Sequence, residues 1–308
     1  MTPLRQALDD YLTMRRGLGY KLERAEKLLA QFLAYLDEVG ADNVTVEHAL
    51  AWARLPADSD PSWRSQRLSV VRGFAAYLRT LDPAAEVPAA ELLPWRRRRA
   101  TPYLYTDAEI AALIAACASL RFPLRVATYG TLLGLLAVSG LRVGEAIRLD
   151  RGDLDLERGL LLVRDSKFGK SRELPLHATA VRALRTYLRR RQRLQPRPQT
   201  EALFVSLAGT RLRYSNVNWT FLRLVRRAGL KPRSATCRPR LHDLRHSFAV
   251  RTVLDAYRAD SDVQARLPLL STYLGHVDPA ATYWYLSAAP ELLALAGQRL
   301  ERHLETRP

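Results

Sequence analysis

The sequence predicts a mainly α-helical protein with a small antiparallel β-sheet, in which a helical N-terminal domain precedes an α+β domain. Apolar residues recur at spacings of three and four through most of the chain, which is the period of an amphipathic helix. Two short runs, 160–163 and 172–176, flank a glycine-containing turn and predict a β-hairpin. The length of 308 residues suits two domains, and 48% hydrophobic residues suffice for a core in each.

Residues 1–93 are predicted to form a domain of about four helices. Two apolar stripes have the helical period, one over 28–36 and one over 68–78. Gly40 and the Asp60–Pro61 and Asp82–Pro83 pairs separate the helical segments.

Residues 94–104 are predicted to be a basic linker between the domains. The segment lacks a periodic pattern and carries four consecutive cations between prolines, namely Arg96, Arg97, Arg98 and Arg99. Two interpretations stay open: a solvated tether, or a basic strap across a phosphate backbone.

The second domain is expected over residues 105–308. Thr106 and Glu109 form a capping-box pattern that fixes a helix start. A helix over 126–138 is expected to end at Gly140, and a short helix to begin at Arg142. After the hairpin, helices are predicted over 181–193, 215–228, 241–257 and 290–304, with a short strand at 203–205.

The charge distribution favours a nucleic-acid partner. The chain has a formal net charge of +17, and residues 180–240 hold 16 basic residues but a single acid, Glu201. A merely solvated surface would mix both signs, whereas a surface that binds a polyanion concentrates one. Most of the cations are arginines, which can give two parallel hydrogen bonds to phosphate oxygens.

Several classes of protein are disfavoured. Apolar runs are too short to cross a membrane, and the N-terminus lacks the apolar core of a signal peptide. The two cysteines, Cys117 and Cys237, are too few for a disulfide framework or a zinc cluster. We therefore expect a cytoplasmic protein that is associated with the nucleoid when bound to DNA and has no metal or cofactor.

Four segments could together carry phosphodiester chemistry without a metal. That chemistry needs a nucleophile, cations at the nonbridging oxygens, and an acid for the leaving oxygen. The segments are 139–145, 165–172, 241–246 and 274–285. Singly, each has a purely structural interpretation: Arg142 could be a surface arginine, and His242 and Arg245 could share a solvated helix face.

The order of these segments resembles the tyrosine recombinases, or phage integrase family, over about residues 101–304. The resemblance implies that residues 105–308 are the catalytic domain and that residues 1–93, which match only in size and helical character, are the core-binding domain that binds DNA. The Gly-Leu-Arg-x-x-Glu box matches Gly140 to Glu145, and the hairpin lysine matches Lys167. The His-x-Leu-Arg-His box is complete at 242–246, and the Leu-Gly-His box is at 274–276. The nucleophile expected nine residues later is Tyr285, with Tyr283 and Tyr273 as rival phenols.

The resemblance implies a site-specific recombinase that cuts and rejoins DNA through a 3′-phosphotyrosyl link in integration, excision or transposition of a mobile element. Tyr285 would attack the phosphate while Arg142, Arg245 and His276 bind its nonbridging oxygens. Lys167 would protonate the leaving oxygen, His242 would accept the phenol proton, and Glu145 would support the arginine. Candidate DNA contacts are Arg96, Arg97, Arg98, Arg99, Lys170, Arg172, Arg211 and Arg213.

The resemblance also implies partners and leaves alternatives. Double-stranded recombination sites would be bound by a homotetramer on two DNA duplexes, or together with a related recombinase. The apolar stripe near the C-terminus, over 292–300, would dock on a neighbouring protomer or on its own domain. Residues 255–268 form a longer, more polar stretch than the family pattern suggests. A type IB topoisomerase-like enzyme and an inactive DNA-binding accessory protein are the rival functions.

Overall fold

The computed structural model describes residues 3–55, 57–93, 100–165, 169, 171–259, 261–275 and 290–305. It divides into two compact units, residues 1–99 and 100–308. The predicted fold class is confirmed, because the described chain is mostly helical with one small antiparallel sheet.

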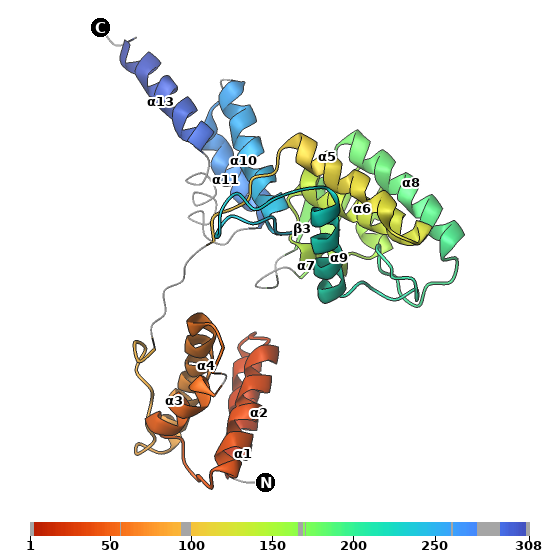
Figure 1. The fold of residues 1–308 in the computed structure, drawn as a ribbon. Helices are drawn as coiled ribbons and strands as arrows, with labels where there is room; N and C mark the ends of the chain where they lie inside the picture. The colour runs from red at the N-terminus through yellow and green to blue at the C-terminus, as the bar shows by residue number, and fades with distance from the viewer. Residues whose placement is uncertain are drawn as a thin grey trace. The chain divides into compact units, whose positions relative to one another are not determined.

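The first unit holds four helices among its described residues, as the sequence predicts: α1 (Pro3–Gly17), α2 (Glu23–Glu38), α3 (Val46–Arg54) and α4 (Pro61–Leu81) (Figure 1). The Thr45 hydroxyl accepts from the backbone N–H of His48 and so caps α3, and Asp60 caps α4 ahead of Pro61. Their apolar stripes meet in one core around Phe32, Trp52 and Phe74.

The second unit opens with α5 (Asp107–Ala116), a short 3-10 turn (Cys117–Ser119), α6 (Pro123–Ser139) and α7 (Val143–Arg148). Thr106 and Glu109 form the predicted capping box at the start of α5. The chain preceding it is already part of this unit, because Tyr103 and Tyr105 are buried in its core. The second unit therefore begins at Ala100, inside the segment interpreted as a linker.

A three-stranded antiparallel sheet follows, with the order β1 (Leu154–Asp155), β2 (Leu160–Val163) and β3 (Arg172–Pro175). Leu161 of β2 pairs with Leu174 of β3, and both are buried in the core. The predicted hairpin is confirmed. The strand predicted at 203–205 is wrong: Val205 forms an isolated bridge to Arg211, while Leu203 and Phe204 fill the core beneath the helices.

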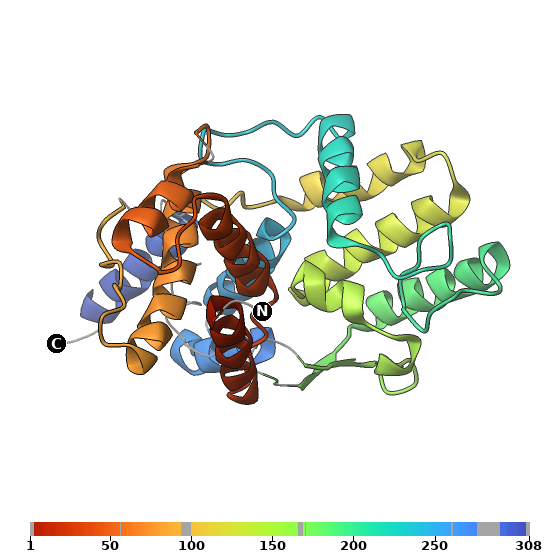
Figure 2. The same ribbon diagram turned by 90° about the horizontal axis from the view of Figure 1, so that it is seen from below.

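Among the described residues, the remaining helices are α8 (Ala178–Leu194), α9 (Tyr214–Arg227), α10 (Asp243–Arg258), α11 (Val263–Leu274) and α13 (Pro290–Glu305). Helices α5, α6 and α8 lie side by side, as both views show (Figures 1 and 2). Helix α11, which contains Pro268, was not predicted from the sequence. Most of the stretch 255–268 is therefore helical, at the end of α10 and the start of α11.

Candidate active site

Three separate segments of the second unit bring the candidate residues together. The turn between α6 and α7 carries Arg142, the first turn of α10 carries His242 and Arg245, and α11 ends at Gly275. Gly140 ends α6 with a φ of +60°, and a Cβ at this position would lie 2.5 Å from Cδ1 of Phe248. A side chain here would therefore push α6 and α10 apart.

Arg245 connects two of these segments from inside the protein. Its side chain is buried, with 1% of the residue exposed. Nη1 donates to the Gly140 carbonyl at 2.8 Å, and Nη2 donates to the Leu274 carbonyl at 2.7 Å. The guanidinium thus fixes the end of α11 against the turn that carries Arg142.

Glu145 is a buried carboxylate between two arginines. Arg142 donates to it from both its backbone N–H and its Nη1, at 2.9 and 2.8 Å, and Arg172 Nη2 donates to it at 2.9 Å. Burial acts to raise the pKa of Glu145, but the hydrogen bond and charge of Arg172, followed by the backbone and side-chain hydrogen bonds of Arg142, outweigh it and lower the pKa to about 2. Glu145 is therefore ionised at neutral pH and orients both guanidinium groups.

Arg142 itself reaches the end of α11. Its Nη2 donates to the Gly275 carbonyl at 3.3 Å, and 28% of its side chain is exposed. An arginine that is held at one edge and open to solvent at another can offer further N–H groups to an anion.

Arg172 has partners that the sequence did not suggest. Besides its two bonds to Glu145, its Nε donates to the Tyr273 carbonyl at 2.8 Å, and 13% of its side chain is exposed. A Cβ on Gly275, whose φ is +68°, would lie 2.9 Å from Nη1 of Arg172. The guanidinium of Arg172 is thus occupied within the protein, and its contact with DNA stays a prediction.

His242 lies one helical turn before Arg245 and keeps an exposed edge. The protein packed around the imidazole lowers its pKa to about 4, and the positive charges of Arg245 and Arg142 act in the same direction. The His246 ring meets it edge-on, with the ring centroids 4.7 Å apart. A neutral imidazole at pH 7 can accept a proton, as the role expected of His242 requires.

The beginning of α10 is fixed by a buried ion pair that the sequence analysis did not single out. Asp243 is 0% exposed and accepts from Nε and Nη2 of Arg240, both at 2.9 Å. Arg240 Nη2 also donates to the Thr101 carbonyl at 3.4 Å. This pair holds the first turn of α10, and with it His242, against the chain that enters the unit.

Other predicted site residues stay untested. Lys167, Lys170, His276, Tyr283, Tyr285 and Arg96 to Arg99 lie outside the described residues. Arg213 is exposed at the start of α9, whereas Arg211 donates to Asp150 at 2.5 Å and to the Ile147 carbonyl at 2.9 Å.

Within the described ranges, no group of three or more His, Cys, Asp or Glu side chains could hold a metal, and no helix is long and apolar enough to cross a membrane.

Comparison with known proteins gives a consistent result. The model of the phage integrase family matches residues 104–291. A Sinorhizobium fredii protein described as an integrase/recombinase is 45% identical over all of both chains, and a tyrosine recombinase XerC of Azotobacter vinelandii is 32% identical over 90% of this chain and 88% of its own.

Solved structures support the fold. The Tn1549 transposon integrase in complex with transposon right end DNA has a TM-score of 0.64 at 17% identity, covering 96% of this chain and 98% of its own. XerA recombinase has a TM-score of 0.51 at 23% identity, covering 98% and 99%. The resemblance noted in the sequence is thereby confirmed: this chain belongs to the phage integrase family of tyrosine recombinases and is a site-specific DNA recombinase.

Proposed function

We propose that this recombinase cuts and rejoins DNA through a covalent link between Tyr285 and the 3′-phosphate of the cleaved strand. The observation that carries the proposal is the meeting of Arg142, His242 and Arg245, from segments a hundred residues apart, around the turns at Gly140 and Gly275. Tyr285 follows the Gly275 turn by ten residues in the sequence.

The proposed step exchanges one phosphoester for another. The phenol oxygen of Tyr285 attacks phosphorus, the bond from phosphorus to the 5′-oxygen breaks, and the DNA keeps a free 5′-hydroxyl. The phenol proton passes to neutral His242, and Lys167 gives a proton to the leaving oxygen. Because the number of phosphoester bonds is unchanged, resealing is the reverse reaction and needs no external energy source.

The cations supply the stabilisation of the transition state. The pentacoordinate phosphorus carries more oxygen charge than the ground state, so preorganised guanidinium donors favour it. Arg142, which is partly exposed, binds the nonbridging oxygens together with Arg245 and His276. Glu145 and Arg172 act as positioning residues, because their contacts are with Arg142 and with the end of α11.

Double-stranded recombination sites are the proposed partner, with a tetramer on two duplexes and action at the nucleoid in the cytoplasm. A tetrameric lambda integrase on a Holliday junction shares the fold, with a TM-score of 0.58 at 20% identity, covering 92% of this chain and 76% of its own. In the described part of α13, Leu292 is buried in an apolar cluster of its own unit that includes Val250 and Leu270. The beginning of α13 is thus packed on its own protomer. The rest of α13 is the part that we propose contacts a neighbouring protomer.

Covalent trapping tests the proposal. The full-length protein is incubated, with EDTA throughout, with nicked duplexes carrying the terminal sequences of its own element, and the products are resolved on a denaturing gel and mapped by peptide mass. We expect a protein–DNA adduct at Tyr285 that is lost in Tyr285→Phe and kept in Tyr283→Phe. An adduct that persists in Tyr285→Phe would place the nucleophile elsewhere. Tight binding to the cognate ends without any adduct would favour the inactive accessory protein.

A further inference from the structure

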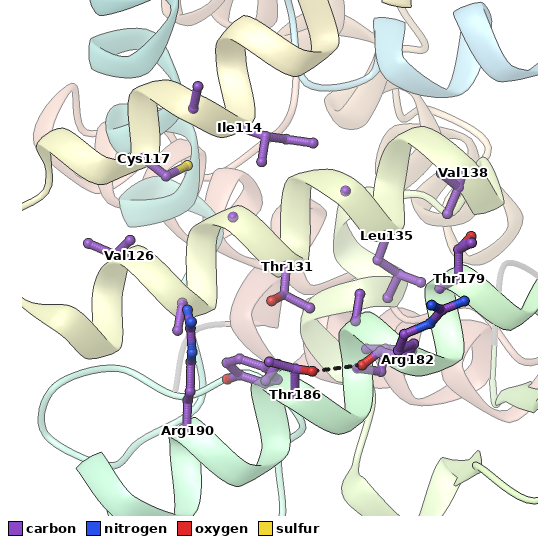
Figure 3. Close-up of a pocket in the computed structure, with 18 of the residues that line it drawn as sticks. Ile114, Cys117, Val126, Thr131, Leu135, Val138, Thr179, Arg182, Thr186 and Arg190 are labelled. Carbon is purple, nitrogen blue, oxygen red and sulfur yellow. Dashed lines mark hydrogen bonds between the residues drawn. The ribbon is translucent and has the colours of Figure 1, made fainter.

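A groove runs along the second unit where α5, α6 and α8 meet. Its volume is about 780 Å³, and its walls include Ile114 of α5, Thr131 and Val138 of α6, and Arg182 and Arg190 of α8 (Figure 3). A second hollow of about 660 Å³ continues it, because Ala118, Val126 and Arg190 line both. None of the candidate catalytic residues that the structure describes lines either hollow.

The floor of the groove is apolar, and several of its large hydrophobic side chains are exposed to solvent. Val138 is 53% exposed, Ile114 37%, and Leu194 in the second hollow 44%. Residues 126, 130, 134 and 138 follow one another at intervals of four along α6 and form a single stripe. The stripe covers three helical turns, or about 18 Å at 1.5 Å per residue.

Two glycines keep this floor open. Gly130 and Gly134 lie in the middle of α6, where glycine costs about 0.5–1 kcal/mol relative to alanine. A Cβ at Gly130 would come no closer than 4.0 Å to Cys117, and one at Gly134 would lie 3.8 Å from Ile114. Both distances are ordinary contacts, so the fold itself does not require glycine. Without side chains at these two positions, the stripe on α6 stays open to a bound ligand.

The rim of the groove is positively charged. Arg182 and Arg190 line the main hollow, and Arg121 and Arg193 line its continuation, while neither lining contains an acidic residue. Within the part of the chain that the structure describes, none of the four forms an ion pair with a carboxylate. Arg182, Arg190 and Arg193 all belong to α8, so the apolar floor lies beside a row of cations, which is complementary to a ligand with an apolar face and an acidic edge.

We propose that the groove of α5, α6 and α8 docks an acidic amphipathic helix of about three turns from a partner protein. Its apolar residues, spaced by three and four, would lie along the Val126–Val138 stripe, and its acidic residues would face Arg182 and Arg190. A DNA strand is a poorer occupant, because phosphates would satisfy the arginines but would leave Ile114 and Val138 against a polar backbone.

The test uses a defined probe: a fluorescein-labelled peptide of 14 residues with four leucines on one helical face and glutamates on both flanks. Fluorescence anisotropy at 0.15 M salt measures its affinity for the full chain. The Gly130→Leu/Gly134→Leu variant fills the floor without changing charge, and we expect binding to weaken by at least about tenfold, or 1.4 kcal/mol. Arg182→Glu/Arg190→Glu should weaken it by a similar factor.

Matched controls separate the groove from the general positive charge. Arg226→Glu/Arg227→Glu changes net charge equally at exposed positions of α9 outside the groove, and we expect an affinity within twofold of wild type. A peptide with the same leucines and with lysine in place of glutamate should not bind. Covalent trapping at Tyr285 should be unchanged in the leucine variant, so a failure of the proposed chemistry would be seen separately.

Two results would overturn the proposal. One is equal binding of the acidic peptide to wild type and to Gly130→Leu/Gly134→Leu, which would mean that the peptide responds to charge alone. The other is self-association of the wild-type chain in sedimentation velocity that the leucine variant abolishes, because the occupant of the groove would then be a second copy of this protein.

Discussion

Replacing Arg172 with methionine removes a cation from a buried carboxylate while keeping an apolar stem of similar length. Among the described residues, Glu145 would keep only Arg142 as a charged partner, and the Tyr273 carbonyl would lose the N–H that reaches it at 2.8 Å. The side chain of Glu145 is 2% exposed, so water cannot replace the lost guanidinium without a rearrangement.

The expected loss can be worked out from the titration of Glu145. Its pKa is lowered from 4.5 to about 2, which corresponds to about 3 kcal/mol of stabilisation at neutral pH, and Arg172 is the larger of the two arginine contributions. Losing most of that and one further hydrogen bond should cost about 3 kcal/mol, close to the 3–5 kcal/mol typical of breaking a buried ion pair. The carboxylate gains stability from folding above pH 4.5, so the cost should be constant from pH 8 to 5 and should shrink as the pH falls from 4.5 toward 2.

Urea denaturation followed by circular dichroism measures this cost, together with a thermal shift of about 6–12 °C for a unit of this size. Arg189→Met, at an exposed position of α8, is the matched control and should stay within about 0.5 kcal/mol of wild type. The double variant Glu145→Gln/Arg172→Met should lose less than the sum of the single variants, because no buried charge is left alone. An Arg172→Met protein as stable as Arg189→Met would refute the reasoning.

Three further predictions concern the same region. Gly140→Ala should cost about 2–4 kcal/mol in urea denaturation, because its Cβ meets Phe248 and its φ is positive; a neutral result would contradict the geometry. The His242 imidazole should titrate below pH 5 in NMR, so the folded state loses stability as the pH falls from 6.5 toward 4; a midpoint near 6.5 would contradict this. Tyr273→Phe should leave covalent trapping intact, since burial raises the pKa of this phenol and Arg172 bonds its carbonyl; loss of the adduct would revive Tyr273 as nucleophile.

Local sequence patterns predicted the elements that depend on local chemistry. The capping box at Thr106, the glycine that ends α6, and the hairpin of β2 and β3 are all set by residues within a few positions of one another. Helix α11 was not predicted, because the stretch 255–268 was interpreted only as longer and more polar than the family pattern, and Pro268 lies inside the helix, where proline is disfavoured. The strand expected at 203–205 is absent because Leu203 and Phe204 are buried in the core without a strand partner, and Val205 forms only an isolated bridge to Arg211.

The site could be predicted only in part, because local motifs identify its residues but not the long-range contacts between them. Motif spacing identifies Arg142, His242 and Arg245 as a set, but their proximity depends on long-range contacts that no local pattern contains. Arg172 shows the limit most clearly. As an arginine beside a basic hairpin it suggests a phosphate contact, and only the folded chain places Glu145, 27 residues away, against its guanidinium.

Three arginines hold the C-terminal end of α11, and they donate hydrogen bonds to the backbone carbonyls of three consecutive residues. Arg172 binds the carbonyl of Tyr273, Arg245 that of Leu274, and Arg142 that of Gly275. Every residue has a backbone carbonyl, whatever its side chain. The hydrogen bonds to the end of α11 therefore depend on the three arginines and on Gly275, which leaves room for the guanidinium of Arg172. Because Arg245 also contacts Gly140 and Arg142 also contacts Glu145, a displacement of α11 would move the two guanidinium groups that are proposed to bind the phosphate. The turn at Gly275, ten residues before Tyr285 in the sequence, is therefore held by these two arginines and by the positioning residue Arg172.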